Sequence, residues 1–100
     1  MPVTEEKPKT IHTRVNHPFT IRLWEDRTTA NVWHVEYDPL SISQLDDDFQ
    51  RTTIATTVDA GSRIFEFKAL KPGTHTVLFT KRMGVVVTEE RRVFQVTAQS

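Results

Sequence analysis

Short runs in which apolar and polar residues alternate constrain the fold of this chain more than any other feature. In one run Phe19, Ile21 and Leu23 share a face. Other rows of the same period are Ile11, Thr13 and Val15; Trp33, Val35 and Tyr37; Phe65, Phe67 and Ala69; Val77 and Phe79; and Phe94 and Val96. A period of two is that of a β-strand, whose successive side chains point to opposite faces. Because no segment shows a convincing helical period, we expect an all-β fold.

Turn signals such as Lys71-Pro72-Gly73 separate the alternating runs at intervals of about ten residues, as in a β-sandwich. We therefore predict an immunoglobulin-like antiparallel β-sandwich of about seven or eight strands. The expected strands are 10–15, 18–24, 31–37, 40–44, 51–58, 63–70, 74–81 and 91–98. We expect residues 46–51 to hold one short helical turn at most. Residues 10–98 then form a single domain that follows a flexible N-terminal arm, residues 1–9.

Composition excludes several classes of function. The chain has 100 residues and no cysteine, which excludes disulfides, thiol catalysis and cysteine-ligated zinc. Its 13 basic and 13 acidic residues cancel, so no net positive field attracts nucleic acid or an anionic membrane. No apolar run is long enough to span a bilayer. Residues 1–9 are polar, unlike a signal peptide, so we expect a cytoplasmic or virion-associated protein unless an export signal has been removed.

No pattern indicates catalysis or a metal site. The four histidines form no His-x-x-x-His pair, and no serine stands in a nucleophile-elbow sequence. His34, Glu36 and Asp38 share one strand face, which is chemically able to hold a metal, but polar residues on a solvent-facing strand are far commoner. The run 46–48 is Asp-Asp-Asp and lacks the spacing of a calcium loop. We expect no enzyme activity, metal or cofactor.

Function in such a fold is expected in the loops, because exposed loops on a rigid scaffold carry binding in sandwiches. The loops at 25–30, 59–62 and 82–89 are the main candidates. Alternate connections of a sandwich emerge at the same end, so we expect these three loops side by side.

Residues 23–33, which read Leu-Trp-Glu-Asp-Arg-Thr-Thr-Ala-Asn-Val-Trp, resemble the first binding loop of the chagasin family, the proteinaceous inhibitors of papain-type cysteine peptidases. The family pattern is Asn-Pro-Thr-Thr-Gly between a strand Leu and a Trp. The pair Thr28 and Thr29 and the following Trp33 are retained, whereas the Asn, Pro and Gly are replaced by Asp26, Arg27 and Ala30.

Two further stretches are similar to this family. Residues 65–75 resemble its strand and Gly-Thr-His turn, which lead to a loop whose family signature is Arg-Pro-Trp. Gapless counting places Met83, Gly84 and Val85 on that signature, and a slip of one residue places Arg82 on its Arg. The family's Gly-rich third loop corresponds to residues 58–61, where Gly61 remains.

The resemblance implies an inhibitor that occludes the cleft of a papain-type peptidase with these loops. The partner-binding residues that it implies are Asp26, Arg27, Thr28, Thr29, Ala30, Asp59, Ala60, Gly61, Arg82, Met83, Gly84 and Val85. The residues also allow plainer interpretations. Thr28 and Thr29 also suit an ordinary turn, and Val85 also suits a packed hairpin. Trp33 is expected in the core, while Trp24 is either an exposed contact or packs under its loop.

A second hypothesis belongs to another class of function. The same sandwich is widely reused, and fold alone does not fix function. The chain could serve as a structural or assembly module, such as a virion decoration protein or a surface adhesion domain, whose partner is itself or another structural subunit. An arm such as residues 1–9 would then become ordered against a neighbour.

Overall fold

The computed structural model describes residues 3–5, 7–26, 32–51, 60–83 and 88–100. In these ranges the chain forms strands and no helix, so no helix suited to crossing a membrane is found there. The strands are β1 (Val3–Glu5), β2 (Lys9–Arg14), β3 (Phe19–Asp26), β4 (His34–Glu36), β5 (Ile42–Arg51), β6 (Ala60–Ala69), β7 (Gly73–Met83) and β8 (Thr88–Gln99).

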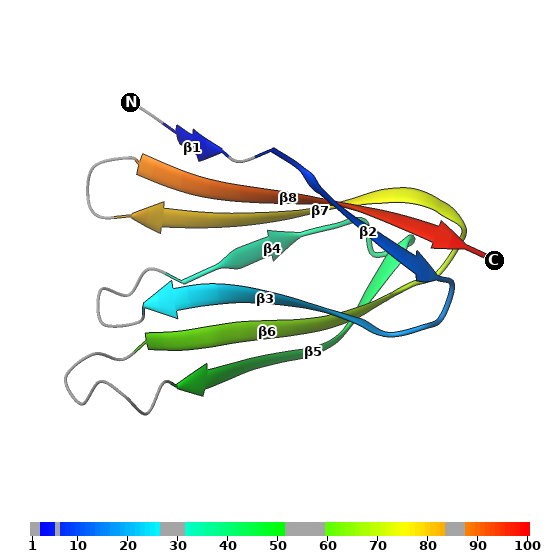
Figure 1. Ribbon diagram of the computed structural model, residues 1–100, viewed down its shortest axis with the longest axis horizontal. Coiled ribbons are helices and arrows are strands. Elements are labelled where there is room, and N and C mark those ends of the chain that lie inside the picture. Colours follow the sequence, from blue (N-terminus) through cyan, green and yellow to red (C-terminus); the bar gives the residue numbers. More distant parts are fainter. Residues whose placement is uncertain (1–2, 6, 27–31, 52–59, 84–87) are drawn as a thin grey trace.

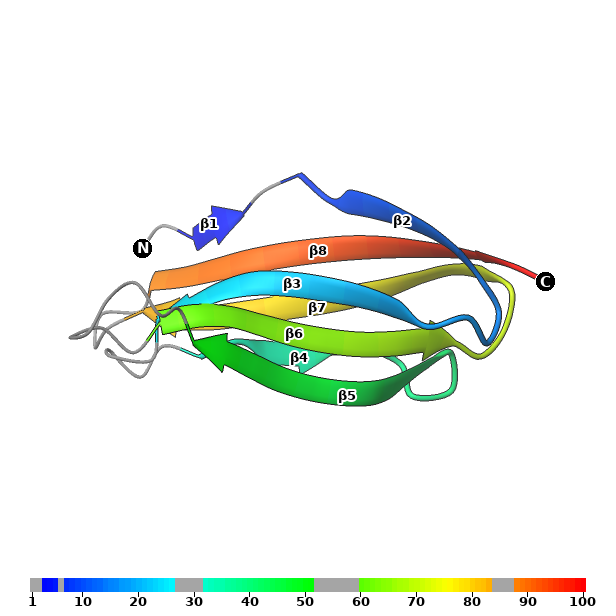
Figure 2. The same ribbon diagram turned by 60° about the horizontal axis from the view of Figure 1, so that its bottom comes forward.

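The strands form two sheets that face each other (Figures 1 and 2). The smaller sheet has the order β3-β6-β5, and both of its pairings are antiparallel. In the larger sheet, β8 pairs with β7 and β7 pairs with β4, again antiparallel. Strands β1 and β2 both pair with β8 in parallel, which departs from the antiparallel expectation. The two layers are those of a β-sandwich.

Aromatic rings from both sheets fill the core between the layers. Phe65 and Phe67 of β6 are fully buried, as is Phe79 of β7. The ring centroids of Phe65 and Phe79 lie 5.0 Å apart, and those of Phe79 and Phe94 lie 5.5 Å apart in an edge-to-face arrangement. The alternation in the sequence predicted this core correctly, because each of these strands turns one face to the other sheet.

Strand β5 differs from the sequence expectation. The expected end of the strand 40–44 is wrong, because residues 46–51, for which the sequence allowed one helical turn at most, extend β5 along β6 from Asp46 opposite Glu66 to Arg51 opposite Gly61. The register shifts between Gln44 and Asp46, where one extra residue forms a β-bulge. Backbone pairing with β6 thus overrides the turn preference of three consecutive aspartates. Of the strand expected at 51–58, residues 52–58 lie outside the described ranges.

Part of the segment expected to be a flexible arm has a place in the larger sheet. Val3–Glu5 lies along β8, with Val3 opposite Glu89 and Glu5 opposite Arg91. Further along the same strand, Lys9–Arg14 lies opposite Phe94–Gln99. The N-terminal segment therefore follows β8 over most of its length (Figure 2).

The turn between β4 and β5 is held by Asp38. Its carboxylate accepts hydrogen bonds from the Leu40 N–H at 3.0 Å and from the Ser41 hydroxyl at 3.1 Å. The bond from Leu40 is the main cause that lowers the pKa of Asp38 below its ordinary value of 3.8, and the bond from Ser41 adds to it. The ionised carboxylate therefore stabilises the folded chain.

Because the folded-state pKa of Asp38 is lowered, its contribution to stability is complete above the ordinary carboxyl range and is lost as the pH falls below 3.8. We expect Asp38→Asn to lower the melting temperature at pH 7 and to have a smaller effect at about pH 2.5, where the Asp38 carboxyl is protonated in the unfolded chain and part of its contribution has been lost. Thermal unfolding of both proteins at the two pH values measures this. An equal loss at both values would contradict the prediction.

Gly61, at the start of β6, has no room for a side chain. A Cβ atom built there would lie 2.0 Å from the carbonyl oxygen of Gln50 on β5, and that oxygen belongs to the backbone. We expect Gly61→Ala to lower the free energy of unfolding by about 2 kcal/mol or more, through forced separation of β5 and β6.

The control for this variant is Gly73→Ala. Gly73 has a positive φ of 117° but space around its Cβ position, so the expected loss is about 1 kcal/mol from backbone strain alone. Denaturant titration of both variants decides the point. A loss for Gly61→Ala no larger than that for Gly73→Ala would contradict the close approach.

Candidate functional site

Several strands end or begin at one end of the sandwich. Strand β3 ends at Asp26, opposite Ala60 of β6, and β5 ends at Arg51, opposite Gly61. The last pair of the β7–β8 hairpin is Met83 opposite Thr88. Figures 1 and 2 show these ends on the same side of the molecule. The three connections that the sequence singles out therefore start from neighbouring strand ends.

The structure describes five of the predicted site residues, and all five lie in strands. Asp26 is the last residue of β3, Ala60 and Gly61 are the first two of β6, and Arg82 and Met83 are the last two of β7. The expected loops 25–30, 59–62 and 82–89 are therefore too long where they meet the strands, because the backbone pairing of β3, β6, β7 and β8 continues into them. The other predicted residues, Arg27, Thr28, Thr29, Ala30, Asp59, Gly84 and Val85, lie outside the described ranges.

A buried carboxylate connects the two sides of the 27–31 segment. Glu25 of β3 is 0% exposed, and its Oε1 accepts a hydrogen bond of 2.8 Å from the backbone N–H of Trp33. The indole Nε1–H of Trp33 in turn donates to the carbonyl oxygen of Trp24 at 2.7 Å. These two bonds cross between β3 and the residues before β4. They fix the distance between the points where the segment leaves and rejoins the sandwich.

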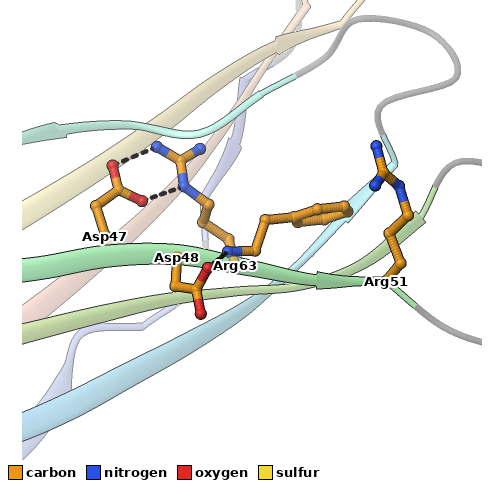
Figure 3. Close-up of a pocket in the computed structure, with 5 residues that line it drawn as sticks. Asp47, Asp48, Arg51 and Arg63 are labelled. Atoms are coloured by element: carbon orange, nitrogen blue, oxygen red, sulfur yellow. Dashed lines mark hydrogen bonds and ion pairs between the residues drawn. The ribbon is translucent and has the colours of Figure 1, made fainter.

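Arg63 of β6 neutralises this buried charge. Its Nη1–H donates to Glu25 Oε1 at 2.8 Å and to the carbonyl oxygen of Trp33 at 3.3 Å. The other side of the guanidinium forms a two-bond pair with Asp47 of β5, with Nε to Oδ1 at 2.5 Å and Nη2 to Oδ2 at 2.7 Å (Figure 3). A paired and hydrogen-bonded buried carboxylate avoids the large cost of an isolated one.

The hydrogen bonds to Asp47 are the main cause that raises the pKa of Arg63 above its ordinary value, and Glu25 adds to the shift. Arg63 therefore stays charged at any pH at which the protein is folded. The guanidinium also lies over the ring of Phe65, 4.7 Å from its centroid, which joins the ionic network to the aromatic core.

Trp33 is held from the larger sheet as well. Its ring is buried, and the Nζ of Lys81 lies 4.7 Å from the ring centroid, with Arg92 at 5.7 Å. Glu90 of β8 pairs with Lys81 at 3.3 Å and also with Arg92. The expectation of a core Trp33 is thus confirmed. Trp24, by contrast, is 59% exposed, so its expected exposure is confirmed, and its role as a contact stays a prediction.

The network of Glu25, Arg63 and Asp47 was not predicted from the sequence. One signal was present, because Glu25 continues the inward row of Phe19, Ile21 and Leu23, and a charge on an apolar face calls for a partner. Nothing local identifies Arg63 as that partner, since it lies on another strand. The arrangement contains no nucleophile–base pair. What it can do is hold the base of a loop rigid.

Comparison with known families decides which kind of protein this is. A family model described as chagasin family peptidase inhibitor I42 matches residues 12–98. The chain belongs to the chagasin family of peptidase inhibitors. The match runs from His12 in β2 to Ala98 in β8, so it includes strands β3 to β7 and all the residues of the Glu25 network. No curated protein sequence gives a significant match.

Solved structures share the fold. The cysteine protease inhibitor EhICP2 from Entamoeba histolytica superposes with a TM-score of 0.79 at 21% identity, covering 97% of this chain and 94% of that one. Amebosin gives 0.69 at 14% identity, over 97% and 96%. PbICP-C, solved in complex with falcipain-2, gives 0.65 at 14% identity, over 97% and 98%. The predicted immunoglobulin-like β-sandwich is confirmed.

We expect the two carboxylates of the Glu25 network to contribute unequally to the free energy of unfolding. Glu25→Ala removes a fully buried partner of Arg63 and also leaves the Trp33 N–H without its acceptor. We expect it to lower the free energy of unfolding by about 2–3 kcal/mol. Asp47→Ala removes the partly exposed partner of the same guanidinium, and we expect a loss below about 1 kcal/mol. Denaturant titration measures both, and similar losses would contradict the assigned role of Glu25.

Proposed function

We propose that this protein inhibits papain-type cysteine peptidases by placing the loop end of the sandwich in the active-site cleft. The family match over residues 12–98 carries this proposal. The pairing of PbICP-C with falcipain-2 supports a cysteine peptidase as the partner. The contact residues are proposed to be those predicted from the sequence, with Thr28 and Thr29 at the centre.

Inhibition of this kind needs no chemistry from the inhibitor. Loops that fill the cleft exclude substrate and place no scissile bond within reach of the peptidase nucleophile. Affinity then depends on how little order the loops must gain on binding. The bonds that join Glu25, Trp33 and Trp24 support this mechanism, because they fix both ends of the segment that carries the Thr pair. The Thr hydroxyls are suited to bonding their own backbone, and the methyl groups add apolar contact.

The decisive experiment is titration of papain and several other papain-type peptidases with the purified protein. We expect tight, reversible inhibition of at least one enzyme. In the double variant Thr28→Ala, Thr29→Ala we expect inhibition at least tenfold weaker, because two central side chains of the contact are shortened (about 1.4 kcal/mol).

A matched control is the double variant Thr20→Ala, Thr74→Ala. These exposed threonines lie near the starts of β3 and β7, at the opposite end of the sandwich from the loops. We expect this control to inhibit like the wild type. Absence of inhibition by micromolar wild-type protein across the panel would refute the proposal and favour the assembly module. Equal inhibition by both double variants would show that Thr28 and Thr29 are not part of the contact with the peptidase.

A further inference from the structure

A groove of about 350 Å³ lies beside β3 and is lined by both sheets. The lining residues include Lys9 on β2, Arg22 and Trp24 on β3, Lys81 on β7, and Glu90 and Arg92 on β8. Apart from Trp24, for which an exposed contact was one of two interpretations, the groove lies outside the residues predicted from the sequence as the binding site. Its lining combines cations with an exposed aromatic ring.

The charge of the groove is strongly positive. Four cationic side chains, Lys9, Arg22, Lys81 and Arg92, face one carboxylate, that of Glu90. Glu90 already pairs with Lys81 and Arg92. Lys9 and Arg22 are exposed, and within the described part of the chain neither forms an ion pair. An otherwise neutral chain therefore presents two uncompensated cations at one place.

Trp24 adds an apolar surface beside these cations. Its side chain is 59% exposed, although the carbonyl oxygen of the same residue is engaged by Trp33. The indole is thus presented outward on a backbone that is fixed. Tryptophan and arginine are the residues most enriched among those that dominate the affinity of protein interfaces. An exposed tryptophan and an unpaired arginine two positions apart on β3 have the composition of such a contact.

The groove is continuous with the loop end of the sandwich. Trp24 lies two positions before the end of β3 at Asp26, and Lys81 lies two positions before the end of β7 at Met83. Those ends lead into residues 27–31 and 84–87, the segments that carry half of the proposed contact residues, including Thr28 and Thr29. A peptidase that is held by these segments has its surface next to the groove.

We propose that this groove is a second contact surface for the target peptidase and receives an acidic segment bordering its active-site cleft. This inference rests on the proposed inhibitory function. Carboxylates of that segment pair with Arg22 and Lys9, and an apolar side chain between them covers Trp24. The charge pairs accelerate association, whereas the buried indole slows dissociation.

The test uses the intact protein and the papain-type peptidase that it inhibits most tightly. Arg22→Glu reverses one unpaired charge, and Trp24→Ala removes the exposed ring. The matched controls are Arg14→Glu, an exposed arginine near the other end of the molecule, and Leu40→Ala, an exposed apolar residue in the turn between β4 and β5. Since all four side chains are exposed, melting temperatures should stay close to that of the wild type.

We expect Arg22→Glu to slow association about tenfold at low ionic strength, with a smaller effect at about 0.5 M salt. We expect Trp24→Ala to raise the dissociation rate about tenfold. Both controls should stay within about twofold of the wild type. Replacing acidic residues around the peptidase cleft by lysine, one at a time, should yield one enzyme variant that restores fast association with Arg22→Glu.

The two proposals fail in different ways. If the wild type inhibits a peptidase and both groove variants inhibit it with unchanged rates, the groove is not a contact and only this inference is overturned. If Arg14→Glu slows association as much as Arg22→Glu does, the effect is one of overall charge and the inference is again overturned. If the wild type inhibits no papain-type peptidase, the inhibitory function fails and the groove proposal fails with it.

Discussion

The contact between aromatic rings of the two sheets is the interaction on which the rest of this structure depends. Phe65 and Phe67 of β6 meet Phe79 of β7 across the sandwich, and Phe79 meets Phe94 of β8. Each such pair contributes about 0.5–1.5 kcal/mol beyond the burial of its surface. Since the chain has no cysteine, no covalent link assists this contact. The relative position of the strand ends, and therefore of the loops, follows from how these rings pack.

At the loop end the core changes from apolar to ionic. There the inward row of β3 ends in Glu25, and Arg63 spans from this carboxylate to Asp47 while its guanidinium lies over Phe65. A buried ion pair contributes less stability than apolar packing of the same volume, because both charges lose their water. Its contribution is instead to position Trp33, because its hydrogen bonds hold this residue at one place and in one orientation. For an inhibitor that acts through ordered loops, a well-positioned loop base is worth the lower stability of the buried ion pair.

The sequence was sufficient for the fold and the core, because alternation of period two is local and identifies the inward face of each strand. The rows ending at Ala69 and Val96 are buried as predicted. Of strand β5 only the start was predicted, because the three aspartates that follow resemble a turn and only their pairing with β6 makes them a strand. The Glu25–Arg63 bond joins residues 38 positions apart, so no local pattern could reveal it. The resemblance to a family, not periodicity, directed attention to Thr28 and Thr29.

The parallel pairing of β2 with β8 has a consequence for how the protein is made. Lys9 lies opposite Phe94 and Arg14 lies opposite Gln99, so an early strand of the chain takes a late one as its partner. Ribosomes add about 5–20 residues per second, which leaves β2 unpaired for on the order of ten seconds after it emerges. Until β8 follows, β2 has no neighbour in the larger sheet and β7 has only β4. Closure of the sandwich therefore waits for β8, and until then an exposed strand edge is open to chaperones and to other nascent chains.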